Sequence, residues 1–161
     1  MHCRTAVRGD LAAIVALLAD DVLGRSREVA AVDDTTADTT AGDTVVDEAY
    51  QRAFADIDAD PRNQLVVAEQ DGEVIGCLQI TYIPGLGRHG TERSLIEAVR
   101  VRSDRRGAGV GRAMLTWAID QARGRGCGLV QLTTDKRRTD AQRFYLGLGF
   151  TASHEGMKLA L

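Results

Sequence analysis

Three glycines, Gly107, Gly109 and Gly111, occupy every second position within VRVRSDRRGAGVGRAML at residues 99–115. The alternation before them is typical of a strand, and the apolar spacing after them is typical of a helix. Glycine lets a backbone approach a ligand closely or adopt a positive φ. The first amides of a helix lack partners inside the helix, so together with the helix dipole they attract anions. Arginines flank the glycines and would add charge-assisted contacts to oxyanions. The stretch therefore predicts a phosphate cradle at the start of a helix.

Two common phosphate-binding motifs do not fit this stretch. A P-loop requires GxxxxGK[ST], and no Lys-Ser or Lys-Thr pair follows these glycines. A dinucleotide-binding unit requires GxGxxG early in a βαβ unit and an acidic residue about 20 positions later. Here the spacing is GxGxG, it lies late in the chain, and Cys127 and Gly128 stand near the place of the acidic residue. Both alternatives are therefore weak.

The segment RRGAGVGRAML instead resembles the acyl-CoA-binding motif [RQ]-x-x-G-x-[GA] of the GNAT superfamily of N-acetyltransferases, which Arg106, Gly109 and Gly111 match. The preceding LIEAVRV is similar to the fourth strand of that family. Further along, AQRFYLGLGF is similar to the family's late signature, a helix that ends in FY-x-x-x-GF. The resemblance covers residues 95–150, and its two motifs stand in the family's order.

The resemblance implies acetyl-CoA as the cosubstrate and no metal. It places the pyrophosphate on backbone amides and assigns to the cradle Arg106, Gly107, Ala108, Gly109, Val110, Gly111 and Arg112. Val99 and Val101, on the fourth strand, would pair through their main chain with the pantetheine arm. The amide of Val99 would then donate to the thioester carbonyl and stabilise the developing oxyanion.

Glu97 is the candidate general base. Acetylation of an amine requires a neutral nitrogen, and a carboxylate can accept the ammonium proton directly or through water. Glu97 interrupts the apolar run SLIEAV, so we expect it in a largely buried strand, where burial would raise its pKa. A glutamate on this strand often serves as the base in the family. The alternative is a structural carboxylate that pairs with an arginine.

Tyr145 is the candidate general acid, because it matches the tyrosine of the FY signature and its hydroxyl could protonate the departing CoA thiolate. The alternative is a core tyrosine whose hydroxyl reaches water. One position departs from the family: Arg138 stands where many members carry an asparagine that contacts the cofactor. A second hypothesis is that Lys136 and Arg138 bind the 3′-phosphate of CoA. The alternative is that these residues belong to a solvated basic loop.

Composition narrows the classes of partner. The chain has 161 residues, a net charge of −3 and only 4% aromatic residues, which argues against a nucleic-acid binder. It shows no signal peptide and no apolar run near the roughly 20 residues of a membrane helix, so we expect a cytoplasmic protein without a membrane partner. Cys3, Cys77 and Cys127 form no CxxC pair, which favours a reducing compartment.

The pattern of elements predicts one α/β domain over residues 1–161 with a mixed, mostly antiparallel sheet and helices, and the resemblance implies that this is the GNAT-like fold with helices flanking the sheet. We expect strands at residues 2–7, 64–83, 94–101 and 129–134, with a hairpin turn at Asp71-Gly72. We expect helices at residues 11–23, 45–59, 109–125 and 140–148, and a final strand pair at residues 150–153 and 157–161. The acidic stretch at residues 33–60 could attract a cationic acceptor or simply be solvated.

The sequence thus predicts an enzyme that moves an acetyl group from acetyl-CoA to a primary amine of a small molecule or peptide. Two alternatives remain open: a non-catalytic acyl-CoA-binding sensor, and an acyltransferase that uses a longer acyl chain. A nucleotide-phosphate protein is a more distant alternative. Homodimers are common in the family, so a homodimer is a state that the resemblance allows.

Overall fold

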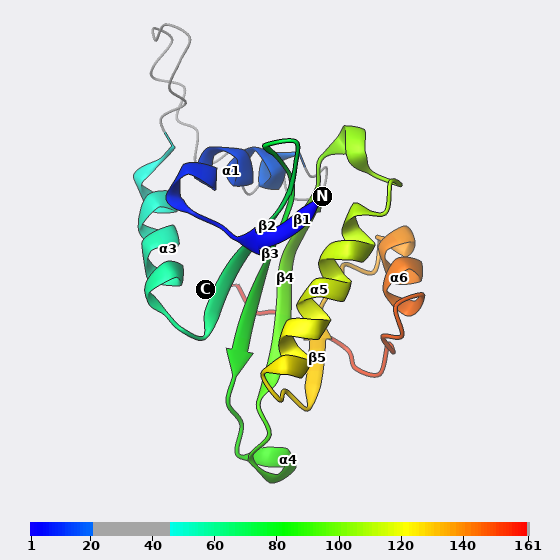
Figure 1. The fold of residues 1–161 in the computed structure, drawn as a ribbon. Coiled ribbons are helices and arrows are strands. Elements are labelled where there is room, and N and C mark those ends of the chain that lie inside the picture. Colours follow the sequence, from blue (N-terminus) through cyan, green and yellow to red (C-terminus); the bar gives the residue numbers. More distant parts are fainter. Residues whose placement is uncertain (21–45, 161) are drawn as a thin grey trace, which may run out of the picture.

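The computed structural model describes residues 1–20 and 46–160 (Figure 1). Its elements are β1 (His2–Thr5), α1 (Leu11–Ala19), α3 (Glu48–Ala59), β2 (Asn63–Gln70), β3 (Glu73–Ile83), the short α4 (Gly87–Gly90), β4 (Arg93–Val101), α5 (Val110–Gly124), β5 (Leu129–Leu132) and α6 (Thr139–Leu146). Short 3-10 turns at Arg8–Asp10 and Ser103–Arg105 precede α1 and follow β4. None of the described helices is both long and apolar enough to cross a membrane.

The five strands form one sheet in the order β1-β2-β3-β4-β5. The first three pairs are antiparallel, and β4 and β5 are parallel. This confirms the predicted mixed, mostly antiparallel sheet. The predicted hairpin also forms: Asp71 and Gly72 adopt φ values of 54° and 80° in the turn between β2 and β3.

Helices cover both faces of the sheet and create two cores (Figure 1). On one face α5 packs against β2, β3 and β4, and its buried residues Val110, Met114 and Ala118 meet Leu78 and Ile80. On the other face α1 and α3 enclose a smaller cluster that contains Ile14, Leu17, Phe54, Val67 and Cys77. Because both faces are covered, side chains of the middle strands are buried in alternation on either side.

A bulge in β4 changes the alternation of its side chains between the two faces of the sheet. Cys77 faces Arg100 and Gln79 faces Glu97, so Ala98 and Val99 together stand opposite one residue of β3. Ala98 has φ 50°, a left-handed value that is unusual for alanine. The extra residue turns Val99 and Val101 toward the α5 core, whereas Glu97 lies on the opposite face with Gln79.

Two predictions of secondary structure need correction. The expected final strand pair does not form, because residues 150–160 contain neither helix nor strand; residue 161 lies outside the described part. The first helix was expected to run to residue 23 but ends at Ala19 with Asp20 as its C-cap. The part of the acidic stretch at residues 33–45 falls outside the described residues.

Candidate functional site

The glycine cradle lies between β4 and α5, as expected from the sequence. Gly107 and Gly109 have φ values of 79° and 84°, which explains why both positions hold glycine. Gly109 is the N-cap of α5, and no side chain caps the helix there. A Cβ added to Gly107 or Gly109 would meet no atom within 4 Å, so the backbone faces open space. Gly111 lies within the helix, and a Cβ added there would lie 3.5 Å from Phe144 Cζ and 3.7 Å from Val101 Cγ2.

The amides of this loop are largely available to a ligand. Arg106 and Ala108 donate long 3.4 Å bonds to the carbonyls of Ser103 and Arg105. Among the described residues, Gly107, Gly109, Val110 and Gly111 have no backbone hydrogen-bond acceptor for their N–H groups. These open donors sit at the positive end of a 15-residue helix. The geometry therefore suits an oxyanion such as a pyrophosphate.

The side chain of Arg106 fastens the cradle to its surroundings. Its Nη2 donates to the Asp20 carboxylate at 2.8 Å and to the Asp20 carbonyl at 3.2 Å, and its Nε donates to the Val101 carbonyl at 3.1 Å. The end of α1, the end of β4 and the cradle are thus joined through one guanidinium. Arg112, in the first turn of α5, is exposed beside the cradle.

β4 and β5 separate where the catalytic residues were predicted. Their pairing runs from Arg93↔Leu129 to Ile96↔Leu132, and β5 ends there. β4 continues to Val101, so its last five residues pair with β3 alone among the described strands. The bulge at Ala98 falls in this unpaired part. An extended ligand could enter the gap and reach the main chain of β4 at Val99 and Val101.

Glu97 begins this unpaired part of β4, but its environment is not the one expected. The side chain is exposed, so the prediction of a buried strand position is wrong. Glu97 follows the buried Ile96, so strand alternation places it on the face opposite α5, and the bulge that comes after it returns the neighbouring valines to the core. The desolvation that the sequence suggested for this carboxyl is therefore absent.

Tyr145 lies on α6 and packs against the core beneath α5. Its ring lies 5.2 Å from that of Phe144 and 6.0 Å from that of Phe150, measured between centroids. Burial raises the pKa of the Tyr145 hydroxyl, and the positive charges of Arg100 and Arg138 oppose that rise. A protonated hydroxyl that lies near cations is suited to donate a proton to a thiolate.

The basic residues around α6 divide into two groups. Arg100, from β4, and Arg138, at the N-cap of α6, both act electrostatically on Tyr145. Arg100 also donates to the Val99 carbonyl at 2.9 Å. Lys136 instead pairs with Glu155 at 2.5 Å, and Arg137 pairs with Asp135 at 2.7 Å. Arg138 therefore belongs to the Tyr145 end of the site.

A row of polar side chains crosses the sheet beside Glu97, and the sequence analysis missed it. Gln79 stands opposite Glu97 in the β3–β4 register. Its amide donates to Asn63 at 3.1 Å, and the Thr81 hydroxyl donates to the same Asn63 oxygen at 2.8 Å. Asn63 in turn donates to Asp60 at 2.7 Å. The signal was present as polar residues at alternate positions of an otherwise apolar strand.

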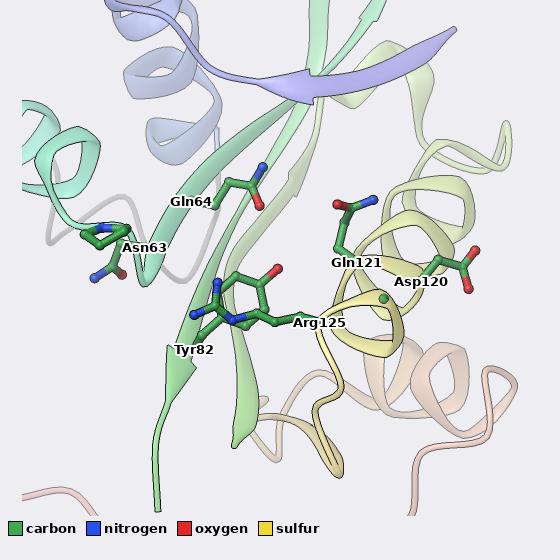
Figure 2. Close-up of a pocket in the computed structure, with 8 residues that line it drawn as sticks. Asn63, Gln64, Tyr82, Asp120, Gln121 and Arg125 are labelled. Atoms are coloured by element: carbon green, nitrogen blue, oxygen red, sulfur yellow. The ribbon is translucent and has the colours of Figure 1, made fainter. Parts of the chain in front are cut away.

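A recess in the described structure lies elsewhere. It has a volume of about 470 Å³ and is lined by Pro61, Asn63, Gln64, Tyr82, Asp120, Gln121, Gly124 and Arg125. Figure 2 shows Tyr82 and Arg125 together, with the guanidinium 4.3 Å from the ring centroid. Arg125 also pairs with Glu92 at 2.6 Å. This recess lies at the end of α5 that is opposite the cradle, and none of the predicted site residues lines it.

The described residues hold no cluster of three or more histidine, cysteine or acidic side chains that could bind a metal. Cys77 is fully buried, and desolvation raises its pKa to about 12. It is therefore a core thiol.

Comparison with known proteins identifies the family. The profile of the Acetyltransferase (GNAT) family matches residues 30–150. The chain belongs to this family. It is thus an acetyltransferase, and its sheet has the family's architecture, as the motifs around Gly109 and Tyr145 indicated.

Three individual relatives are similar to this GNAT chain. Aminoalkylphosphonate N-acetyltransferase from Salmonella typhimurium is 34% identical over 107 residues, which cover 66% of this chain and 69% of the relative. A crystal structure of a transcriptional regulator from Bacillus halodurans C-125 is 45% identical, has a TM-score of 0.88 and covers 99% of both chains. An acetyltransferase from Trypanosoma brucei is 25% identical, with a TM-score of 0.74 and 99% coverage of both chains.

Proposed function

We propose that this chain transfers the acetyl group of acetyl-CoA to the primary amine of a small molecule. The observation that carries the proposal is the juxtaposition of two features along β4. The strand loses its β5 partner after Ile96, and it leads directly into open amides at Gly107 and Gly109. One extended ligand with a diphosphate at one end and a thioester at the other fits both features.

In this proposal the cradle amides hold the diphosphate, and the main chain of Val99 and Val101 holds the pantetheine arm. The carbonyls of both valines already accept bonds from Arg100 and Arg106. The amide of Val99 donates to the thioester carbonyl as negative charge develops on its oxygen. The arginine contacts keep the strand ordered where it has no β5 partner.

The reaction is a direct transfer from sulfur to nitrogen. Glu97 accepts a proton from the ammonium group, and because this carboxylate is exposed, solvent then receives that proton. The neutral amine forms the C–N bond, the C–S bond breaks, and Tyr145 donates its proton to the departing thiolate. The proton that the amine nitrogen loses restores the tyrosine through solvent.

The acceptor approaches from the face that carries Glu97. On that face Gln79 and Thr81 extend the polar surface toward Asn63, which Asp60 holds in place. A fixed amide next to the carboxylate can accept a hydrogen bond from the ammonium group, so Gln79 positions the nitrogen. Substituting Gln79 by Leu should raise KM for the amine and leave the affinity for acetyl-CoA unchanged.

The acceptor carries an acidic group as well as the amine. Arg100 and Arg138 place positive charge beside Tyr145 at the reacting end of the site. The Salmonella relative acts, by its name, on aminoalkylphosphonates, which combine an amine with an acidic group. A peptide amine remains the alternative acceptor, and it does not require these two arginines.

Release of CoA from acetyl-CoA in the presence of single amines tests the proposal. We expect turnover with 2-aminoethylphosphonate to exceed that with ethanolamine, which lacks the acidic group, and that with a short peptide. Arg100→Gln should lower kcat/KM for 2-aminoethylphosphonate about tenfold more than it lowers kcat/KM for ethanolamine. Glu97→Gln should lower kcat/KM for every amine by about 100-fold. Full activity of Glu97→Gln would contradict the role of Glu97 as general base. Equal turnover of all three amines would contradict the proposal that the acceptor carries an acidic group.

A non-catalytic acyl-CoA-binding module is the alternative that this assay separates. Such a module would bind acetyl-CoA through the same cradle but release no CoA with any amine. A preference for longer acyl chains would instead appear as faster turnover when acetyl-CoA is replaced by a longer acyl-CoA.

A further inference from the structure

An acidic residue at the end of α1 contacts the loop that we propose for the diphosphate. The carboxylate of Asp20 accepts a hydrogen bond from Nη2 of Arg106 at 2.8 Å, and the Asp20 carbonyl accepts from the same atom at 3.2 Å. Asp20 is the C-cap of α1, and in Figure 1 the end of α1 and the loop before α5 lie at the same end of the sheet. A carboxylate close to an anion site repels the ligand, so its presence there requires another explanation.

The main chain of this loop has few anchors of its own among the described residues. The N–H groups of Arg106 and Ala108 make the loop's backbone bonds, and both bonds are 3.4 Å long. A Cβ at Gly107 or Gly109 would meet no atom within 4 Å, so no neighbouring group packs against either position. The three bonds of the Arg106 side chain are shorter, at 2.8–3.2 Å. This side chain is therefore the main anchor of the loop.

The same bonds determine what the Arg106 guanidinium can do. Its Nη2 is bound to Asp20 at the end of α1, and its Nε is bound to the Val101 carbonyl at the end of β4. The positive charge is thus balanced by a carboxylate. The open amides at Gly107 and Gly109 therefore form the anion site, and the role of Arg106 is to hold the loop that carries them.

We propose that Asp20 is a positioning residue for the diphosphate. Asp20 fixes the Arg106 side chain, and Arg106 in turn fixes the loop so that the amides of Gly107 and Gly109 converge on one ligand. This inference rests on the proposed binding of acetyl-CoA at the cradle.

The contact also joins the two sides of the proposed active site. α1 packs on the face of the sheet opposite α5, which is the face that carries Glu97. Coupling between two sites is reciprocal, so a ligand that fixes the cradle also strengthens the contact with the end of α1. Binding of the cosubstrate is thereby transmitted to the helix that covers the acceptor face.

The sign of the change in affinity separates positioning from simple charge. Asp20→Ala removes a negative charge close to the proposed diphosphate, so charge alone predicts tighter binding of acetyl-CoA. Loss of positioning predicts weaker binding instead. The side chains of Asp20 and Arg106 are 40% and 51% exposed, and exposed pairs contribute modestly, so we expect the Kd to rise by about fivefold. For the same reason the melting temperature should fall by no more than about 4 °C.

Calorimetric titration of the full chain with acetyl-CoA tests the proposal. Asp20→Glu keeps the carboxylate and should restore most of the affinity that Asp20→Ala loses. Asp104→Ala is the matched control, because this carboxylate lies in the same connection but pairs with Arg102 at 2.7 Å. Its Kd should be unchanged or lower than that of the wild type. In the background of Arg106→Gln, Asp20→Ala should not raise the Kd further, because Asp20 acts through that arginine.

Hydrogen exchange gives a second measurement that does not depend on turnover. The Asp20 N–H donates to the Ala16 carbonyl at 3.1 Å in the last turn of α1. Saturating acetyl-CoA should slow exchange of this amide in the wild type and leave it unchanged in Arg106→Gln.

The outcomes distinguish this proposal from the proposed function. If the wild type binds acetyl-CoA and Asp20→Ala binds it equally or more tightly, the positioning role is overturned and the proposed function stands. If Asp20→Ala weakens binding to the same extent with and without Arg106, the positioning role is also overturned. A wild type that does not bind acetyl-CoA overturns both.

Discussion

Two glycines at opposite ends of α5 allow strain to be separated from ligand binding. Gly109 is the N-cap of the helix with φ 84°, and Gly126 follows its C-cap with φ 83°. A Cβ at either position would meet nothing within 4 Å, so alanine causes no steric clash at either one. The helix has 15 residues and is roughly 22 Å long, so the two positions lie at its opposite ends.

Alanine at either glycine should therefore cost the same stability. A left-handed φ costs a residue with a side chain about 1–2 kcal/mol. For a chain of this length each kcal/mol lowers the melting temperature by about 2–4 °C. We expect Gly109→Ala and Gly126→Ala to lower the melting temperature equally, by about 2–8 °C.

Only the alanine at the cradle should weaken the affinity for acetyl-CoA. Relaxation of the strained loop in Gly109→Ala would turn the open amides at Gly107 and Val110 away from the diphosphate. Each hydrogen bond to a charged group contributes about 1.5–3 kcal/mol, so loss of one predicts a Kd at least about tenfold higher. Isothermal titration with acetyl-CoA measures this directly. Equal affinity of both variants would refute the assignment of the cradle, because the strain is the same in each.

Three further predictions concern individual side chains. Tyr145→Phe should lower kcat by about 100-fold in steady-state kinetics and leave the Kd of acetyl-CoA, measured by calorimetry, within about twofold of the wild-type value. An unchanged kcat would contradict the role of Tyr145 as general acid. Arg4 binds Asp10 at 2.7 Å and lowers the pKa of that carboxyl. The pair therefore stabilises the fold fully at pH values above the pKa of an unfolded Asp, near 3.9, and this stabilisation is lost as the pH falls through the lower pKa of the folded state. Urea unfolding should show that Arg4→Ala costs about 2 kcal/mol at pH 7 and much less at pH 2, and a cost independent of pH would contradict this. Cys77 should resist thiol reagents at pH 8 until the protein unfolds, because burial raises its pKa to about 12; labelling of all three cysteines in the native state would contradict its burial.

The sequence predicted the parts of the fold that local patterns determine. The Asp71-Gly72 turn and the apolar face of α5 through Val110, Met114 and Ala118 follow from turn chemistry and helical spacing. The cradle was found for the same reason, since a positive φ at Gly107 and Gly109 requires that residue type. These features depend on few contacts from distant parts of the chain.

The remaining features depend on tertiary contacts that no local pattern reports. Alanine does not favour a positive φ, so nothing in LIEAVRV announced the bulge at Ala98 or the exposure of Glu97. Asp10 directly precedes α1 but its side chain does not cap the helix; its carboxylate instead binds Arg4 and accepts the Val7 amide at 2.8 Å. Residues 157–160 have the sequence pattern of a strand but form none, because a strand also requires a neighbouring strand to pair with, and a local sequence pattern does not report that neighbour.

Binding of acetyl-CoA at the cradle is the central claim, and a calorimetric titration of the full chain tests it most directly. Acetyl-CoA, free CoA and ATP would each be titrated into the wild type and into Gly109→Glu, whose carboxylate would enter the space that faces the open amides. We expect the wild type to bind acetyl-CoA with micromolar affinity, which corresponds to roughly 8 kcal/mol, and the variant not to bind it. If the wild type binds neither CoA species, or if the variant binds as tightly as the wild type, the cradle does not hold the cosubstrate and the roles of Glu97 and Tyr145 lose their basis.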